Sequence, residues 1–284
     1  MVVYATKQEV DAYLQLQKLN NLSIGFVPTM GALHQGHLSL IKESKKKTAL
    51  TVCSIFINPT QFNNASDFEK YPITTEADVQ QLKNAGTDIL FLPTAQEIYP
   101  QGIMALDKYN LGTLETLLEG YYRPGHFQGV CQVVHRLLDV VNPNILFLGQ
   151  KDYQQCLVVQ KLITLIQKNI EVCIVPTIRE ANGLAMSSRN MRLSSKALQQ
   201  ASAIYKAMLY MQENIQQQPI NSLEIAATEM LWNNGFTTID YVSIVEANTL
   251  LPITQIHEGQ KIAIVVAAFI EGVRLIDNLL VEVS

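Results

Sequence analysis

The sequence predicts an α/β protein with a Rossmann-like, doubly wound parallel sheet and a smaller C-terminal α+β domain. Short apolar stretches alternate with helical patterns along the first two-thirds of the 284 residues. The stretches are apolar almost throughout, which is typical of strands buried on both faces of a parallel sheet. After Pro176 the alternation ends, and two helical segments are followed by three strand-like runs.

The first domain is expected over residues 1–177. Its strands are expected at residues 23–27, 50–57, 89–92, 145–148 and 170–175. The helices between them are expected at residues 38–47, 74–85, 130–140 and 153–167. Strands joined by helices pair in parallel, with helices on both faces. Because ligands of such sheets bind beyond the carboxyl ends of the strands, we expect the functional residues in polar segments at strand ends.

The second domain is expected over residues 178–284. Its helices are expected at residues 194–216 and 221–234, with Gly235 ending the second. Its strands are expected at residues 240–245, 261–270 and 274–281. Between these strands there is no helix long enough for a parallel crossover, so the sheet is expected to be antiparallel.

Composition excludes several classes of protein. A hydrophobic fraction of 48% and a charged fraction of 16% suit a packed globular enzyme. The net charge is −4, and the chain has no dense basic stretch apart from Lys45, Lys46 and Lys47. Nucleic acid is therefore not expected as a partner, because binding its backbone requires a concentrated positive surface.

The compartment is expected to be the cytoplasm, with no membrane contact. The longest apolar run, residues 262–270, has about half of the ~20 residues that a membrane helix requires. The N-terminal segment has neither the basic nor the apolar region of a signal peptide. The four cysteines form no CxxC pair, which favours reduced, mostly buried thiols.

The segment PTMGALHQGH at 28–37 connects the first expected strand to a helix and carries His34 and His37. Backbone N–H groups and the positive end of the dipole make a helix start attractive to phosphate. Spaced i, i+3 around Gly36, the histidines can share one face and donate to phosphate oxygens. One histidine capping the helix while the other lies on the surface is the alternative. A zinc site is a third reading, but no further ligand follows at a suitable spacing.

Two further segments carry positive charge. In FLGQKDYQQ at 147–155, Lys151 follows a strand, and Asp152 can cap the next helix or accept from ribose hydroxyls. In MSSR at 186–189, two hydroxyls and the guanidinium of Arg189 suit a loop over a triphosphate.

Two other segments are polar and uncharged or weakly charged. FINPTQF at 56–62 places the amides of Asn58 and Gln61 at a strand end, where they can hold a hydroxylated acid. A simple turn around Pro59 is the alternative. YYRPGHFQGV at 121–130 suits a loop over a site, or an ordinary surface loop.

Together, these five segments resemble the pantothenate synthetase (pantoate–β-alanine ligase) family, within the HxGH nucleotidyltransferases, and they occur in the family's order. The resemblance implies a ligase that activates pantoate with ATP as a pantoyl adenylate and then transfers it to β-alanine, releasing AMP and pyrophosphate. It implies Mg²⁺ with the triphosphate, and a homodimer formed through the N-terminal domain. The smaller domain is expected to close over the site.

The resemblance also implies roles for individual residues. Four are expected to be catalytic: His34, His37, Lys151 and Arg189. The same four are expected to contact the nucleotide, together with Met30, Gly31, Gly149, Gln150, Asp152, Ile178, Met186, Ser187 and Ser188. Three amides are expected to bind substrate: Asn58, Gln61 and Gln155. No protein metal ligand is expected.

Other functions fit the residues less well. A nucleotidyltransferase with a dinucleotide-like product would need a second nucleotide pocket in place of Gln61 and Gln155. An aminoacyl-tRNA synthetase is disfavoured by the acidic charge and the lack of an anticodon-binding domain. A nucleotide sensor without catalysis would not need both histidines, Lys151 and Arg189. A redox Rossmann enzyme is disfavoured because no GxGxxG follows the first strand.

Overall fold

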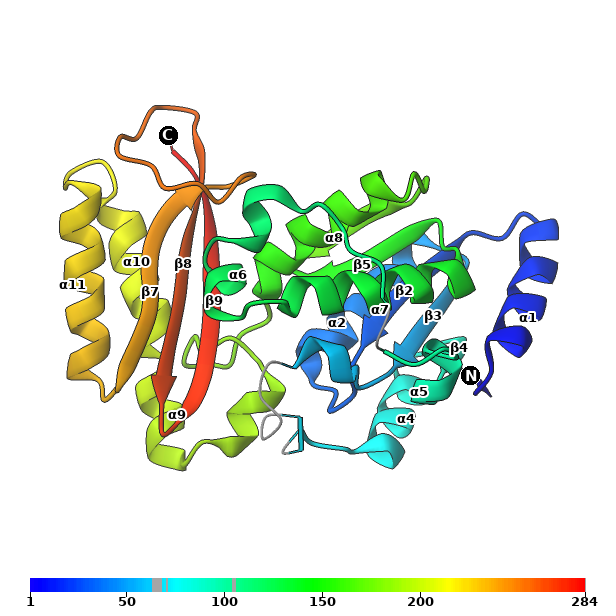
Figure 1. Cartoon of the computed structure of the whole chain (residues 1–284). Coiled ribbons are helices and arrows are strands. Elements are labelled where there is room, and N and C mark those ends of the chain that lie inside the picture. The colour runs from blue at the N-terminus through cyan, green and yellow to red at the C-terminus, as the bar shows by residue number, and fades with distance from the viewer. Residues whose placement is uncertain (63–67, 70, 104–105, 284) are drawn as a thin grey trace. The chain divides into compact units, whose positions relative to one another are not determined.

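The protein is described by a computed structural model that covers residues 1–62, 68–69, 71–103 and 106–283. Within these ranges, six strands form a parallel sheet and three form an antiparallel sheet (Figure 1). Helices connect the strands of the parallel sheet. The predicted fold class is therefore confirmed.

The parallel sheet has the order β1-β4-β3-β2-β5-β6. Its strands are β1 (Val2–Tyr4), β2 (Ile24–Thr29), β3 (Leu50–Ile55), β4 (Ile89–Phe91), β5 (Ile145–Gly149) and β6 (Glu171–Val175). The main helices are α1 (Lys7–Leu19), α2 (Gln35–Lys47), α4 (Thr75–Asn84), α7 (His126–Val141) and α8 (Tyr153–Leu165). Strand β2 lies between β3 and β5, and the sheet continues beyond β3 to β4 and β1 and beyond β5 to β6. The strand order therefore reverses beside β2, where α/β sheets bind their ligands.

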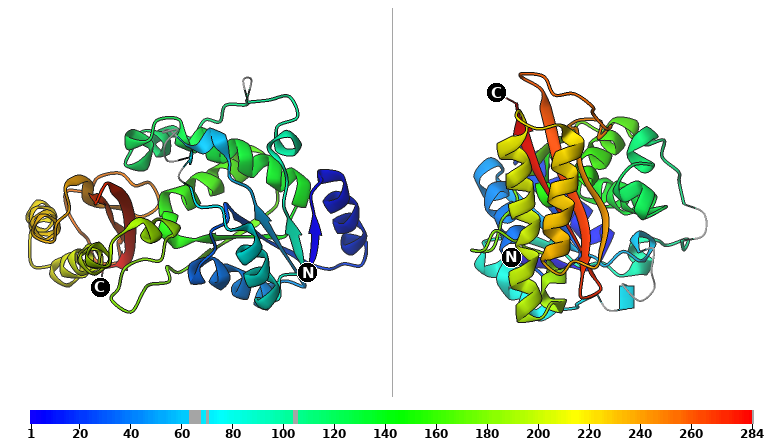
Figure 2. Two further views of the ribbon diagram at one scale, coloured as in Figure 1. Left: turned by 90° about the horizontal axis from the view of Figure 1, so that it is seen from below. Right: turned by 90° about the vertical axis from the view of Figure 1, so that its left-hand side faces the viewer.

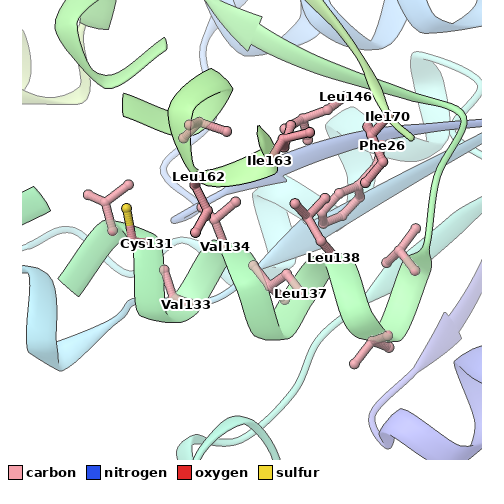
Figure 3. Close-up of a cluster of buried hydrophobic side chains, with 14 of the residues drawn as sticks. Phe26, Cys131, Val133, Val134, Leu137, Leu138, Leu146, Leu162, Ile163 and Ile170 are labelled. Carbon is pink, nitrogen blue, oxygen red and sulfur yellow. The ribbon is translucent and has the colours of Figure 1, made fainter. Parts of the chain in front are cut away.

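Alternating side chains give this sheet two apolar faces. On β2, Phe26 belongs to the core formed with α1, α7 and α8, while Val27 belongs to the core formed with α2 and α4. Figure 3 shows Leu138 of α7 and Leu162 of α8 beside the side chains of the first core. Because consecutive strand residues point to opposite faces, the sheet is covered by helices on both sides.

The chain divides into two compact units. The first contains residues 1–115, 123–149 and 155–176, and the second contains residues 116–122, 150–154 and 177–284. The change of unit at 176/177 lies next to the predicted domain boundary. The second unit also takes in two short segments from the expected first domain, including α6 (Glu119–Tyr122).

In the second unit, β8 (Lys261–Ile270) pairs antiparallel with β7 (Thr238–Glu246) and with β9 (Val273–Glu282). The helices are α9 (Ser195–Ala201), α10 (Ala203–Asn214) and α11 (Ile220–Asn233). Ile264 and Val266 of β8 share a core with α10 and α11, which lie against one face of the sheet (Figure 2). The predicted antiparallel sheet is confirmed.

Several element boundaries differ from the predictions. The helix predicted at residues 194–216 is two helices, because the Ser202 hydroxyl donates to the carbonyl of Gln199 and ends α9 there. Strand β1 was not predicted, since three residues give too short a pattern for periodicity to register. Helix α7 begins at His126, so the segment at 121–130 leads into a helix and does not follow a strand, contrary to the expectation for polar segments.

Three of the four cysteines are buried, as the sequence predicts for most of them. Cys53, Cys131 and Cys156 are buried, and burial raises the pKa of both Cys53 and Cys131 to about 12. Both thiols are therefore neutral and unreactive at neutral pH. Among the residues that the structure covers, no helix has the length and apolar content needed to cross a membrane.

Candidate functional site

The two histidines form a reciprocal cap at the start of α2. The backbone N–H of Gly36 donates to Nδ1 of His34 at 3.1 Å, and the N–H of His34 donates to Nδ1 of His37 at 3.3 Å. The ring centroids are 4.1 Å apart. A Cβ at Gly36 would lie 2.8 Å from Cε1 of His34, so only glycine permits this approach. Both histidines therefore take part in the cap and both are half-buried, so the alternative of one capping and one surface histidine is not observed, and their donation to phosphate stays a prediction.

The cap selects one tautomer for each ring. A nitrogen that accepts a backbone hydrogen bond carries no proton, so the neutral rings of His34 and His37 hold their proton on Nε2. Each Nε2–H is then a donor at the positive end of a helix. This is a suitable arrangement for holding phosphate oxygens without a full positive charge on the ring.

A buried carboxylate fixes the loop that leads to the histidines. Asp78, on α4, is 1% exposed and accepts hydrogen bonds from the backbone N–H groups of Ala32, at 2.9 Å, and Leu33, at 2.8 Å. Ala32 has a φ of +49°, which is unfavourable for a residue with a side chain. Asp78 thus holds a strained loop immediately before His34. Asp78 is not among the predicted site residues, because nothing near it in the chain indicates a partner 46 residues away.

The amide-rich turn after β3 is held by α7. The fully buried side chain of Asn58 donates to the carbonyl of Gly129 at 3.1 Å and accepts from the hydroxyl of Tyr99 at 2.8 Å. Nδ2 of Asn58 lies 3.5 Å from Oε1 of Gln61. The structure therefore gives Asn58 a part in shaping the turn, and its contact with substrate stays a prediction.

His126 secures the same turn from the start of α7. The backbone carbonyl of Gln61 can only accept a hydrogen bond, so Nδ1 of the His126 ring donates to it, at 2.8 Å. Nε2 of His126 lies 3.1 Å from Nη1 of Arg123, which donates to it. His126, which is 5% exposed, was not among the predicted site residues. The segment at 121–130, left open between two readings, therefore supports Gln61.

Substituting Gly129 should disturb this turn selectively. A Cβ at Gly129 would overlap the carbonyl oxygen of Thr60, which belongs to the backbone of the turn. We expect Gly129→Ala to lower thermal stability and to move Gln61. Thermal unfolding and crystallography would measure both effects. Gly149→Ala is the control for stability, because Gly149, like Gly129, has no positive φ, and no atom lies within 4 Å of its added Cβ. If Gly129→Ala keeps the stability and the turn geometry of the parent, the close packing of Gly129 against the backbone of Thr60 is refuted.

In the second unit, the turn after β5 is held by β9. Lys151 is partly buried and its Nζ lies 3.6 Å from Oδ1 of Asp152, which is exposed. The side chain of Gln150 donates to Oδ1 of Asn278 at 3.3 Å. Of the residues predicted to bind the nucleotide, Lys151 and Asp152 thus lie side by side, while the side chain of Gln150 is hydrogen-bonded to Asn278.

The loop at 186–190 is also ordered by local contacts within the second unit. The N–H of Met186 donates to the carbonyl of Ile178 at 3.0 Å, which brings these two predicted residues together. Oγ of Ser187 accepts from the N–H of Arg189 at 3.3 Å. Ser188 is buried, while Arg189 is partly exposed. The loop therefore presents Arg189 from a fixed backbone.

Comparison with known proteins identifies the family. The family model described as pantoate-beta-alanine ligase matches residues 2–280. The chain belongs to this family. A pantothenate synthetase from Cytophaga hutchinsonii is 44% identical over 283 residues, covering 99% of both chains. The resemblance stated from the five sequence segments is confirmed.

Solved pantoate–beta-alanine ligase structures agree over the whole chain. The pantothenate synthetase from Thermus thermophilus has a TM-score of 0.90 at 40% identity, covering 98% of this chain and 99% of that one. The pantoate-beta-alanine ligase from Francisella tularensis, described in complex with beta-gamma ATP and beta-alanine, has a TM-score of 0.81 at 35% identity. It covers 99% of this chain and 97% of that one. The similarity spans both units.

Proposed function

We propose that the groups described above carry out the ATP-dependent condensation of pantoate with β-alanine that defines the pantoate–beta-alanine ligase family. In the first step the pantoate carboxylate attacks the α-phosphorus of ATP, giving pantoyl adenylate and pyrophosphate. In the second, the β-alanine amine attacks the activated carbonyl, and AMP leaves as pantothenate forms. The Francisella tularensis relative, described with beta-gamma ATP and beta-alanine, supports this substrate set.

The observation that carries the assignment is the reciprocal cap of His34 and His37. Their Nε2–H donors stand at a helix start, where they can bind phosphate oxygens as negative charge builds up during attack on phosphorus. His37 acts as a donor to the charged transition state. Met30 and Gly31, in the loop before the pair, lie along the nucleotide.

Positive charge for the triphosphate comes from Lys151 and Arg189. The ammonium of Lys151 acts as a point charge, while the planar guanidinium of Arg189 can bind two phosphate oxygens at once. Asp152 accepts from the ribose. The remaining nucleotide contacts are assigned to Gly149, Gln150, Ile178, Met186, Ser187 and Ser188.

The pantoate site is assigned to Gln61 and Gln155, with Asn58 beside Gln61. Neutral amides can bind the hydroxyls of pantoate without stabilising its carboxylate, which must remain nucleophilic. The hydrogen bond from His126 to the backbone carbonyl of Gln61 supports this assignment, because it fixes the backbone of Gln61 without using the side-chain amide.

Mg²⁺ is proposed to arrive with ATP. Phosphate oxygens and water are its preferred ligands, and it would neutralise charge on the leaving pyrophosphate. In the part of the chain that the structure describes, no cluster of three or more His, Cys, Asp or Glu residues is placed to hold a metal ion. A homodimer through the N-terminal domain, a cytoplasmic location and closure of the second domain over the site remain proposals.

The function can be tested by following pyrophosphate. Purified protein with Mg²⁺ and ATP should release pyrophosphate only when pantoate is present, and AMP should follow only when β-alanine is added. Pyrophosphate release without pantoate would contradict the assignment, as would a lack of AMP after β-alanine. The same assay with another hydroxy acid in place of pantoate measures selectivity.

Gln61→Ala should separate the acid site from the nucleotide site. We expect KM for pantoate to rise about tenfold or more, as for a lost polar contact to a substrate, while KM for ATP changes little. Steady-state kinetics with each substrate varied in turn would measure this. Gln15→Ala, on the exposed side of α1, is the matched control. An unchanged KM for pantoate in folded Gln61→Ala would remove Gln61 from the site.

A further inference from the structure

Strand β9 carries two adjacent buried polar residues that the proposed mechanism does not use. Asp277 is 4% exposed and Asn278 is 3% exposed. Asp277 pairs with Val266 in the sheet, and Asn278 pairs with Val265. Because side chains alternate along a strand, the two project to opposite faces of the antiparallel sheet. β9 is also an edge strand, so one side of its backbone has no neighbouring strand.

Asn278 holds the turn that carries Lys151. Its Nδ2 donates to the carbonyl of Gln150 at 2.8 Å and to that of Lys151 at 2.9 Å, while its Oδ1 accepts from the Gln150 side chain at 3.3 Å. The amide therefore uses both its donor hydrogens and its oxygen on consecutive residues of one turn. Such contacts fix the backbone from which Lys151 extends.

Asp277 holds a different segment through Arg179. The guanidinium donates to both carboxylate oxygens, at 2.5 and 3.1 Å, and lies 4.0 Å from the ring centroid of Tyr205. Nη2 of Arg179 also donates to the carbonyl of Asn278, at 3.3 Å. The N–H of Asn278 donates to Asp277, at 2.8 Å. The side chain of Arg179 is thus held at the unpaired edge of β9 by contacts with both Asp277 and Asn278.

Arg179 begins the hairpin that leads into the 186–190 loop. It forms an antiparallel bridge with Ala185, and its Nη1 donates to the carbonyl of Gly183 at 3.1 Å. The carbonyl of Ala185 accepts from the side chain of Asn190, at 3.0 Å. Because these contacts connect Arg179 to the hairpin, the position of Arg179 also fixes the position of Met186 and of the loop that follows.

This arrangement is better suited to fixing geometry than to adding stability. Burial raises the pKa of Asp277 although Arg179 acts in the opposite direction, so the charged pair is costly to bury. A fork-to-fork ion pair, in contrast, restricts both partners to one relative orientation. The turn of Lys151 and the hairpin that begins at Arg179 are about 30 residues apart in the chain. Both are held by adjacent residues of β9, Asn278 and Asp277 respectively.

We propose that Asp277 and Asn278 are positioning residues for ATP, which together fix the turn bearing Lys151 and the hairpin leading to Ser187 and Arg189. The proposal rests on the nucleotide roles assigned above to Lys151 and Arg189. Neither Asp277 nor Asn278 touches the substrate. Each acts through a backbone segment that it holds.

The test compares Asn278→Ala and Arg179→Lys with Ile276→Ala in the full-length chain. Arg179→Lys keeps the charge but loses the two-pronged contact. Ile276 lies two residues before Asn278 on the same face of β9, and its hydrocarbon side chain can form no hydrogen bond with the turn, so it controls for a weakened strand. KM for each substrate, kcat and the thermal midpoint are measured for all three, together with Lys151→Ala and the double variant Asn278→Ala/Lys151→Ala.

We expect Asn278→Ala and Arg179→Lys to raise KM for ATP about tenfold, the size of an effect from one or two lost hydrogen bonds, with KM for β-alanine unchanged. Ile276→Ala should lower the thermal midpoint without this selectivity. The double variant should be little worse than Lys151→Ala alone, because both changes act through one side chain.

Three outcomes would overturn the proposal, and they are distinguishable. If Lys151→Ala raises KM for ATP while Asn278→Ala and Arg179→Lys do not, Asp277 and Asn278 have no positioning role and the proposed function stands. If Lys151→Ala leaves ATP kinetics unchanged, the nucleotide role of Lys151 fails and the positioning proposal fails with it. An equal rise of every KM in Asn278→Ala and Ile276→Ala would show an effect on stability alone.

Discussion

His37→Ala should lower the rate of pantoyl adenylate formation about 10²–10³-fold, the usual loss when one transition-state donor is removed. The two ring nitrogens of His37 have different parts: Nδ1 accepts from the N–H of His34 and caps α2, while the Nε2–H is the group proposed to donate to phosphate. The alanine variant loses both functions, so it cannot distinguish them. Single-turnover pyrophosphate release measures the adenylation step directly.

Two amide variants separate the functions of His37. His37→Asn places an acceptor oxygen near the position of Nδ1 and lacks the distal donor, so it should keep the cap and remain as slow as His37→Ala. His37→Gln places an amide N–H near the position of Nε2 and should recover part of the rate. All three variants should unfold within a few degrees of the parent. A folded His37→Asn with nearly normal adenylation would show that Nε2 has no catalytic role.

Asp78→Ala should produce the largest loss of stability among the site variants. Its carboxylate accepts from the backbone N–H groups of Ala32 and Leu33, which are both buried. Without it these donors lose a charged partner, at a cost of roughly 2–4 kcal/mol in the free energy of unfolding. The loop would also relax away from the left-handed conformation of Ala32, so adenylation should slow as the histidines move.

Denaturant unfolding and pyrophosphate release on the same samples test this prediction. Asp78→Asn keeps the size of the side chain and one acceptor oxygen, and should lie between the parent and Asp78→Ala in stability. Glu76→Ala removes an exposed carboxylate from the same end of α4 and should change stability by less than about 1 kcal/mol. Equal stability of Asp78→Ala and Glu76→Ala would show that the carboxylate does not hold the loop.

Much of the fold was predictable because it depends on local patterns. The apolar run before Pro28 and the helical pattern after His37 placed a strand, a loop and a helix correctly. The reciprocal cap also had a local signal, since His34 and His37 have the i, i+3 spacing of a capping box. The break at Ser202 did not, because the pattern of buried residues continues across it, and α9 ends through hydrogen bonds from the hydroxyl and the backbone N–H of Ser202 to the carbonyl of Gln199.

Support for the site could not be predicted in the same way. Asp78 is separated by 45 residues from Leu33, and His126 by 65 residues from Gln61. Neither residue stands out in the sequence, because an aspartate in a first helical turn and a histidine before an apolar helix have ordinary local explanations. Their partners are backbone groups, which any sequence supplies. Only the folded chain shows which carbonyl or N–H each one meets.

The sequence by itself determined the alternation of strands and helices, the change of architecture after Pro176, and the histidine, lysine and glutamine segments that identified the family. These features depend on residues close together in the chain, where periodicity and spacing decide the outcome. The tertiary structure alone decided that Asp78 holds the loop before His34, that His126 supports Gln61, and that Asn278 fixes the turn of Lys151. Long-range hydrogen bonds follow from how helices and strands pack, and packing is a property of the whole chain.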